Sequence, residues 1–280
     1  MTGDPRPAAD VRLPRGQHEA MSDGFLAIDG RRLECVRLGP PPEDAPTLVF
    51  LHEGLGSCSA WRDFPARLAE ATGWGALLYS RAGYGASDPV SLPRPVSYLH
   101  DEARDLPRVL DAAQVARAVL FGHSDGASIA LLHAGLGGDP RIEALVLEAP
   151  HVFVEDCAVE SIRRIGEEYA TTDLRDRLAR HHGGNVDVAF HGWNRVWLDS
   201  VFRSWNIEAC LPGIRVPVLV FQGDADPYGT LRQVTAIQRG VGGSVGVEVL
   251  AGCGHSPHRE RPEAVISRTK RFLAELRGTG

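Results

Sequence analysis

The sequence predicts an α/β fold in which a mostly parallel, eight-stranded sheet carries helices on both faces and a helical cap insertion. Two observations predict the sheet: short apolar runs alternate with helical patterns, and a serine stands in a tight turn between a strand and a helix. A third observation, a long stretch without any strand pattern, predicts the cap. Apolar strands alternating with helices are typical of a parallel sheet covered on both faces.

The first elements follow a polar, proline-rich lead-in over residues 1–20, which we expect to be loosely ordered. Apolar patterns predict strands at 25–28 and 32–38, and Asp29-Gly30 between them is a hairpin turn signal. The predicted core then runs over residues 21–150 and resumes over residues 213–280.

Strand and helix patterns alternate through the rest of the core. Further strands are predicted at residues 47–51, 75–79, 118–121, 144–147, 216–221 and 245–250. A helical spacing begins near Trp61, a second helix is expected near residues 98–116, and a third closes the chain after Val265. Pro107 is expected to kink or split the second helix, because proline lacks the N–H of the helical hydrogen bond.

Residues 151–212 contain no convincing strand, and we expect them to form the helical cap. Segments 161–170 and 173–182 have helical patterns, and an apolar stripe follows at Val186, Phe190, Trp193 and Trp197. We expect most of these rings to join the cap to the core, with one or two lining an apolar substrate pocket.

The composition argues against several classes of partner. The 280 residues are 43% hydrophobic and 24% charged, with a formal net charge of −6. An acidic chain without a basic stripe is not expected to bind nucleic acid. No apolar run approaches the ~20 residues of a membrane helix, and the first residues lack the apolar core of a signal peptide. We expect a cytoplasmic monomer or small homo-oligomer with a small-molecule substrate and no membrane partner.

The cysteines suggest a reducing compartment and no metal centre. They are Cys35, Cys58, Cys157, Cys210 and Cys253. Because their number is odd and no Cys-x-x-Cys pair occurs, we expect reduced thiols. The adjacent His181 and His182 are not expected to bind zinc, since neighbouring side chains on a helix point in different directions.

The tight turn Gly122-His123-Ser124-Asp125-Gly126 is the most informative motif. It joins the predicted strand at 118–121 to a helical run, so that Ser124 is expected in a strained backbone conformation with its hydroxyl exposed above the sheet. The flanking glycines leave room for the neighbouring strand and helix. This geometry predicts a serine nucleophile.

A serine nucleophile needs a base and a group that orients the base. In enzymes with this turn, the acid and the histidine follow the serine in that order. Asp226 comes after the strand at 216–221, and His255 follows the last strand, so we assign them as acid and base. Asp224 and His258 are the competing residues; we expect Asp224 in a loop and His258 as a surface or capping group.

Two backbone N–H groups are expected to form an oxyanion hole. One belongs to Asp125, directly after the nucleophile, and the other to Gly54 in the loop after the strand at 47–51. Glu53 and Leu55 are less favoured alternatives for the second donor.

Together these motifs resemble those of the alpha/beta-hydrolase superfamily over residues 24–277. The resemblance rests on the four segments 52–56, 122–126, 223–226 and 254–255, each at the end of a predicted strand. The arginine- and glycine-rich segment 81–88 is similar to a loop common in the family, and we interpret it as structural. One departure is Glu53, where relatives usually have glycine. Because a carboxylate would oppose charge on the oxyanion, we expect Glu53 to point away or to be neutralised.

The resemblance implies a hydrolase that needs no cofactor and no metal. The leading expectation is cleavage of a carboxylic ester or lactone through an acyl-enzyme on Ser124. The alternatives are carbon–carbon bond hydrolysis of ring-fission products with the same triad, and a noncatalytic small-molecule receptor on the same fold.

Overall fold

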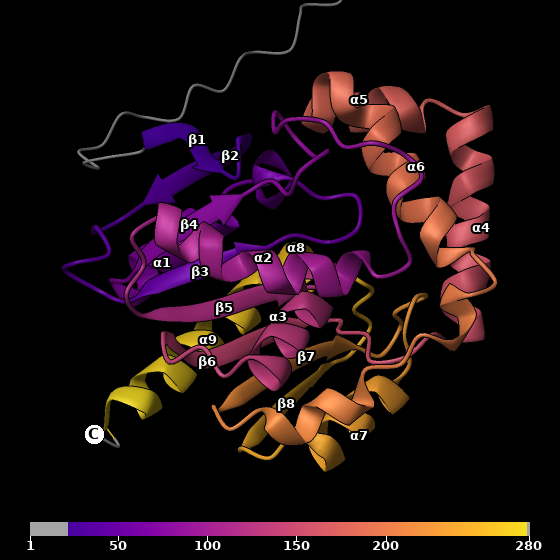
Figure 1. Ribbon diagram of the computed structural model, residues 1–280. Coiled ribbons are helices and arrows are strands. Elements are labelled where there is room, and N and C mark those ends of the chain that lie inside the picture. Colours follow the sequence, from indigo (N-terminus) through magenta and orange to yellow (C-terminus); the bar gives the residue numbers. More distant parts are fainter. Residues whose placement is uncertain (1–21, 279–280) are drawn as a thin grey trace, which may run out of the picture.

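The computed structural model describes residues 22–278, and Figure 1 shows a single twisted sheet with helices packed around it. The predicted lead-in over residues 1–20 lies outside the described residues. The sheet has eight strands in the order β1-β2-β4-β3-β5-β6-β7-β8. They are β1 (Ser22–Ile28), β2 (Arg31–Leu38), β3 (Thr47–Leu51), β4 (Gly75–Tyr79), β5 (Ala118–His123), β6 (Ile142–Glu148), β7 (Val218–Gly223) and β8 (Val245–Leu250).

The sheet is mostly parallel, as predicted. Strand β2 pairs antiparallel with both β1 and β4, and every later pair is parallel. All residues of β3, β4 and β5 are buried, because helices cover both faces of the centre of the sheet. Strand β8 lies at the edge and is only partly buried. The predicted fold class is confirmed.

Two hydrophobic cores lie on opposite faces of the sheet. Alternate residues of β3 divide between them: Leu48 and Phe50 enter one core, and Val49 and Leu51 enter the other. The first core contacts η1 (Cys58–Trp61), α1 (Phe64–Thr72) and α9 (Pro262–Gly278). The second contacts α2 (Tyr98–Ala112), α3 (Asp125–Leu136) and α7 (Leu231–Gly240).

Helix α2 continues through Pro107. Of the two expected effects of this proline, a kink or a split, the split does not occur. The proline leaves the carbonyl of Ala103 without its helical donor. The Nδ1 atom of His133, on α3, lies 3.0 Å from that carbonyl oxygen and donates the missing hydrogen bond. A neighbouring helix therefore supplies the donor that the sequence removes.

Three helices occupy the stretch predicted to be the cap. They are α4 (Asp156–Thr171), α5 (Leu174–His182) and α6 (Val186–Trp197), followed by η3 (Phe202–Ser204) and η4 (Glu208–Gly213). Figure 1 shows α4, α5 and α6 together at one end of the sheet. The Tyr169 and Phe190 rings stack with centroids 3.5 Å apart and so join α4 to α6.

Two further properties bear on the partner expectations. All five cysteines are free, and four of them are buried. Over residues 22–278, no helix combines the length and the apolar character that are needed to cross a membrane.

Candidate active site

Ser124 lies in a strained turn between β5 and α3. Its φ of 52° and ψ of −115° fall in a region that side chains other than glycine rarely adopt, and such strain typically costs about 1–3 kcal/mol. A Cβ at Gly122 would lie 2.6 Å from the Ala127 Cα, and one at Gly126 would lie 1.9 Å from the Leu51 carbonyl oxygen. Both glycines are therefore required by close backbone approach, as the sequence indicated.

Asp226 and His255 are joined by hydrogen bonds. The His255 Nδ1 lies 2.9 Å from each carboxylate oxygen of Asp226. The carboxylate also accepts from the Gln222 side chain and from the Tyr228 N–H, both at 2.8 Å. Burial opposes its ionisation, but the bonds from His255 and Tyr228 outweigh burial and lower the pKa of Asp226 to about 2. An ionised Asp226 keeps the proton on Nδ1 and leaves Nε2 of His255 free to act as a base.

Ser124 and His255 line the same pocket, which has a volume of about 210 Å³. In the described part of the chain no hydrogen bond joins the Ser124 hydroxyl to His255. Catalytic hydrogen bonds are often long in proteins without substrate and tighten on binding. The other lining residues include Glu53, Gly54, Leu55, His151, Trp193, Trp197 and Tyr228.

The competing acid and base have other partners. Asp224 accepts a hydrogen bond from the Gly252 N–H at 2.7 Å, which is a loop-stabilising contact. His258 is buried, contrary to its expected surface position, and its Nδ1 lies 2.5 Å from the Glu148 carboxylate. Asp226 is therefore the carboxylate bonded to His255.

The loop after β3 places Gly54 in the lining of the pocket that also contains Ser124. A Cβ at Gly54 would lie 2.1 Å from the indole nitrogen of Trp193, so any larger residue here requires the loop or the Trp193 side chain to move. Buried Arg81 donates to the carbonyl oxygens of His52 and Glu53 and thereby fixes the loop. In residues 22–278, no protein acceptor is found for the N–H of Gly54 or of Asp125. Their role as oxyanion donors stays a prediction.

Glu53 lies close to two basic groups. Its carboxylate is 3.7 Å from the His123 Nδ1 and 3.8 Å from the Arg259 guanidinium. Burial favours the neutral acid, but His123 and then Arg259 hold the pKa of Glu53 well below its ordinary value. Of the two expectations for this departure from the family pattern, the structure favours neutralisation by partners.

His123 links three loops of the site, and sequence reasoning gave it no role. Its Nε2 donates to the main-chain oxygen of His255 at 2.7 Å, because a carbonyl can only accept. Its Nδ1 faces Glu53. Burial alone would lower the pKa of His123, but Glu53 and then Glu148 raise it above its ordinary value. The sequence does contain a feature that could have suggested this role: an unusual carboxylate at Glu53 occurs together with a histidine directly before the serine.

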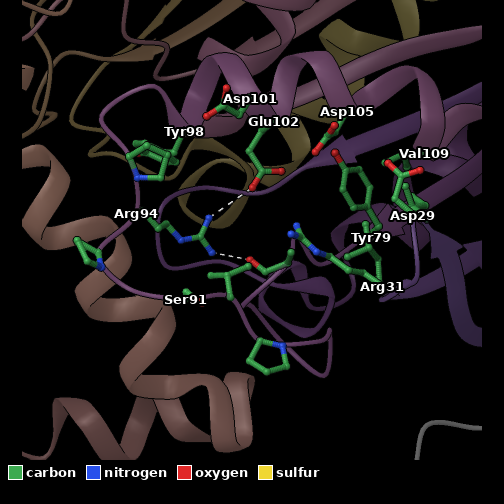
Figure 2. A pocket seen from close by; sticks show the side chains of 17 residues that line it. Asp29, Arg31, Tyr79, Ser91, Arg94, Tyr98, Asp101, Glu102, Asp105 and Val109 are labelled. Atoms are coloured by element: carbon green, nitrogen blue, oxygen red, sulfur yellow. Dashed lines mark hydrogen bonds and ion pairs between the residues drawn. The ribbon is translucent and has the colours of Figure 1, made fainter.

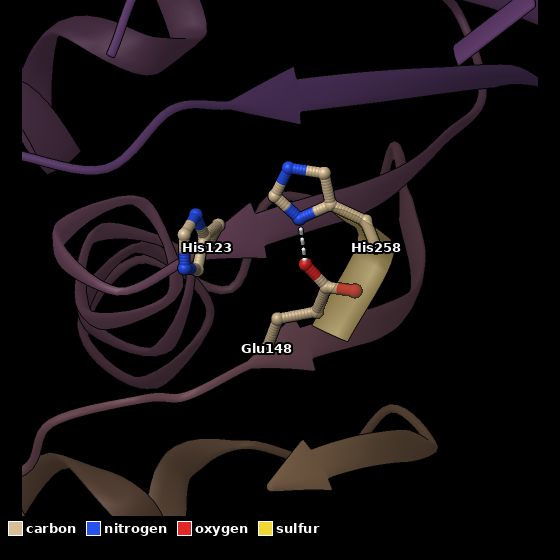
Figure 3. Close-up of side chains that lie close together, drawn as sticks. All are labelled: His123, Glu148 and His258. Atoms are coloured by element: carbon tan, nitrogen blue, oxygen red, sulfur yellow. Dashed lines mark hydrogen bonds and ion pairs between the residues drawn. The ribbon is translucent and has the colours of Figure 1, made fainter. Parts of the chain in front are cut away.

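His123, Glu148 and His258 form a buried cluster below the turn, and Figure 3 shows them facing one another. Their nearest ligand atoms lie within 4.8 Å of one another, and the His123 Nδ1 and one Glu148 oxygen have no hydrogen-bond partner. However, Glu148 and His258 are only 2.5 Å apart, whereas two ligands of one zinc ion, each about 2.1 Å from the metal, lie roughly 3 Å apart. The arrangement therefore fits a direct hydrogen bond between Glu148 and His258 better than a metal ion between them.

A larger cavity, of about 680 Å³, lies between the β1–β2 hairpin, residues 89–95 and α2. Figure 2 shows Arg94 at its centre, bonded to Glu102 and to the Ala82 carbonyl. The Tyr79 hydroxyl points into it from β4. No histidine or cysteine lines this cavity. Without a histidine to serve as the base of a hydroxyl nucleophile, it is not the candidate catalytic site despite its size.

Comparisons with known proteins identify the family of the chain. Residues 48–268 match the family model described as alpha/beta hydrolase family. The chain is similar to 2-succinyl-6-hydroxy-2,4-cyclohexadiene-1-carboxylate synthase of Yersinia pseudotuberculosis, with 30% identity over 87% of this chain and 95% of that protein. Among solved structures it is similar to the enol-lactonase of Burkholderia xenovorans, with a TM-score of 0.67, 22% identity, and coverage of 90% of this chain and 100% of the other.

A second solved structure shows the same likeness. An esterase from a Rhodococcus species has a TM-score of 0.67 and 19% identity over 91% of this chain and 99% of its own. At such identities a structural likeness shows the fold alone. The family model is stronger evidence, because it spans most of the chain and includes β3, the serine turn and the loops that carry Asp226 and His255. The chain belongs to the alpha/beta hydrolase family, a membership that supports hydrolase activity.

Proposed function

We propose that the protein is a serine hydrolase that cleaves a carboxylic ester or lactone through an acyl-enzyme. The observation that carries the proposal is the hydrogen-bonded Asp226–His255 pair, 2.9 Å apart, whose histidine lines the same pocket as Ser124 at its strained turn. An acid, a base and a nucleophile in this order are the parts that acyl transfer requires.

In the proposed mechanism, the Ser124 oxygen attacks the carbonyl carbon of the ester while Nε2 of His255 takes the hydroxyl proton. Asp226 stays ionised and stabilises the imidazolium. The N–H groups of Asp125 and Gly54 donate to the oxyanion, and His255 then gives its proton to the leaving alcohol. Water, deprotonated by His255, attacks the acyl-enzyme and releases the acid with Ser124 restored.

The pocket lining favours a neutral substrate. The curated relatives are named for a carboxylate. The lining of this pocket contains no lysine or arginine, and Glu53 adds a carboxylate to it. The histidine of the lining whose pKa is raised, His123, already pairs with Glu53. An anionic substrate would therefore meet no unpaired cation in the lining, whereas a neutral ester or lactone needs none.

Covalent labelling tests the proposal. A fluorophosphonate probe is expected to modify Ser124 in the native protein, located by mass spectrometry, and to leave folded Ser124→Ala unmodified. Hydrolysis of a short phenyl ester is expected to disappear with the same substitution. A folded native protein that neither labels nor hydrolyses any ester would instead support the receptor alternative.

A further inference from the structure

One wall of the Ser124 pocket carries a histidine that the proposed mechanism does not use. The cap contributes apolar side chains to the pocket, Ala158, Ile162, Trp193 and Trp197. His151, which comes from the segment that follows β6, also lines the pocket. Its residue surface is only 2% exposed. A nitrogen-bearing ring in such a small, largely apolar site is a candidate substrate contact.

The orientation of His151 is fixed by its surroundings. Its main-chain oxygen accepts a hydrogen bond from the Ser128 hydroxyl at 2.6 Å. Its ring packs edge-on against Trp197, with centroids 5.2 Å apart, and lies 5.9 Å from the His255 ring. On another side, a Cβ at Gly229 would lie 3.3 Å from the imidazole Cε1. The ring therefore has little freedom to turn away from the pocket.

His151 remains neutral at physiological pH. Burial, and secondarily the neighbouring His255, lower the pKa of His151 to about 4, although the carboxylates of Asp226 and Glu155 act in the opposite direction. A neutral imidazole carries one N–H and one bare nitrogen. It adds no charge to the pocket and can act as a hydrogen-bond donor through only one atom.

The two nitrogens of His151 differ in their access to the pocket. Nδ1 is fully buried without a hydrogen-bond partner. A buried N–H without an acceptor is rarer and costlier than a bare nitrogen in the same place. The proton therefore belongs on Nε2, for which residues 22–278 supply no acceptor. Because His151 lines the pocket while its Nδ1 is shielded, Nε2–H is the donor available to a bound molecule.

We propose that His151 is a substrate-binding residue that selects short acyl groups bearing an acceptor oxygen, a ketone or a hydroxyl, on the second or third carbon from the carbonyl that Ser124 attacks. This inference rests on the proposed esterase function and narrows its substrate class. The cavity volume of about 210 Å³ limits the acyl group to a short chain. A site with an unpaired buried donor discriminates against an analogue that lacks the acceptor.

Matched ester pairs test this proposal. We would compare phenyl 4-oxopentanoate with phenyl pentanoate, and phenyl 3-hydroxybutanoate with phenyl butanoate, each rate being divided by that ester's alkaline hydrolysis rate. At least one oxygenated ester is expected to show a kcat/KM about tenfold higher or more than its partner. In His151→Phe that ratio should fall to near one while the unsubstituted ester is still hydrolysed. His151→Gln, which retains an N–H donor, should keep part of the ratio.

The control is Tyr228→Phe, which removes the hydroxyl of another pocket residue. A ratio lost in Tyr228→Phe but kept in His151→Phe would overturn the assignment to His151. A native ratio near one for both pairs would overturn the proposal without any variant. Absence of fluorophosphonate labelling and of ester turnover in the native protein would instead refute the underlying esterase function. Each variant is first checked for native circular dichroism and labelling at Ser124, and His151→Leu, which also lacks a donor, serves if His151→Phe does not fold.

Discussion

Glu53 belongs to the loop after β3 and His123 ends β5, and their side chains lie next to each other in the structure. Glu53 replaces the glycine usual in relatives, and His123 fills the variable place before the nucleophile. Their charged groups lie 3.7 Å apart, largely away from water. An isolated carboxylate at this point would oppose the developing oxyanion, and His123 offsets it. The two residues therefore act as a pair.

The pair should make stability depend on pH. The pKa of Glu53 is lowered from an ordinary value of 4.5 and that of His123 is raised from 6.5. The contribution of Glu53 is present above pH 4.5 and is lost as the pH falls through its folded pKa. That of His123 is present below pH 6.5 and is lost as the pH rises through its folded pKa. The pair should therefore stabilise the fold most between these two values.

A double-mutant cycle on unfolding free energy measures this coupling. Glu53→Gln, His123→Gln and the double variant, unfolded in urea at pH 6, are expected to give a coupling of about 1–3 kcal/mol. The coupling should shrink at pH 9, which lies well above the ordinary pKa of histidine of 6.5. A coupling that is equal at both values would mean that the two groups interact through shape rather than charge.

At the scale of elements, a hydrogen bond joins α2 to α3 at the point where Pro107 removes a hydrogen bond from α2. The His133 ring takes the place of the N–H that Pro107 lacks and bonds the Ala103 carbonyl at 3.0 Å. His133 is 5% exposed. Its removal would leave a buried carbonyl without a donor, a loss of about 1–3 kcal/mol. A proline inside a helix is thus accommodated by one side chain of the neighbouring helix.

Because His133 replaces the donor that Pro107 lacks, the effect of substituting His133 on stability should depend on whether residue 107 is proline. His133→Phe should lower the free energy of unfolding by about 1–3 kcal/mol in the native background. In a Pro107→Ala background the alanine N–H can bond the Ala103 carbonyl, so the same change should cost less. Urea titrations of the four proteins supply the comparison. An equal loss of unfolding free energy in both backgrounds would show that His133 stabilises the fold by packing and not by its hydrogen bond to the Ala103 carbonyl.

At the scale of the whole molecule, the cap takes part in the candidate catalytic machinery. Trp193 of α6 packs against Gly54 of the loop after β3. Trp197 donates from the same helix to the Asp125 carboxylate at 3.2 Å, and Tyr98 of α2 bonds that carboxylate at 2.5 Å. Burial raises the pKa of Asp125. The residue after the nucleophile therefore connects the core to the cap.

The contact between Gly54 and Trp193 can be tested by activity. Gly54→Ala should reduce kcat/KM for a phenyl ester by about 10²-fold or more, because its methyl group would displace the indole or the loop that carries a proposed oxyanion donor. Trp193→Ala in the same chain should restore part of the loss by making room. No recovery in the folded double variant would mean that the added methyl group harms the loop itself.

Some features of the candidate site could be predicted from the sequence, and others could not. Local sequence patterns were enough to infer the strained serine turn, its two glycines and the order of strands and helices along the chain. Asp226 is preferred to Asp224 from the sequence because a residue three positions after Gly223 can turn back toward the histidine, and the hydrogen bond to His255 agrees with that choice. The burial of His258 against Glu148 was missed, because that contact joins residues 110 positions apart in the sequence.

The sequence by itself determined the α/β layering, the position of the tight turn and the residues able to supply an acid, a base and a nucleophile. Those features follow from periodicity and from backbone constraints that act over a few residues. Only the tertiary structure decided that His123 neutralises Glu53, that His133 replaces the donor missing at Pro107, and that a neutral His151 faces the pocket. Such pairings depend on which distant side chains share a buried, weakly polar space, where an unmatched charge or N–H is costly and its partner is found by packing.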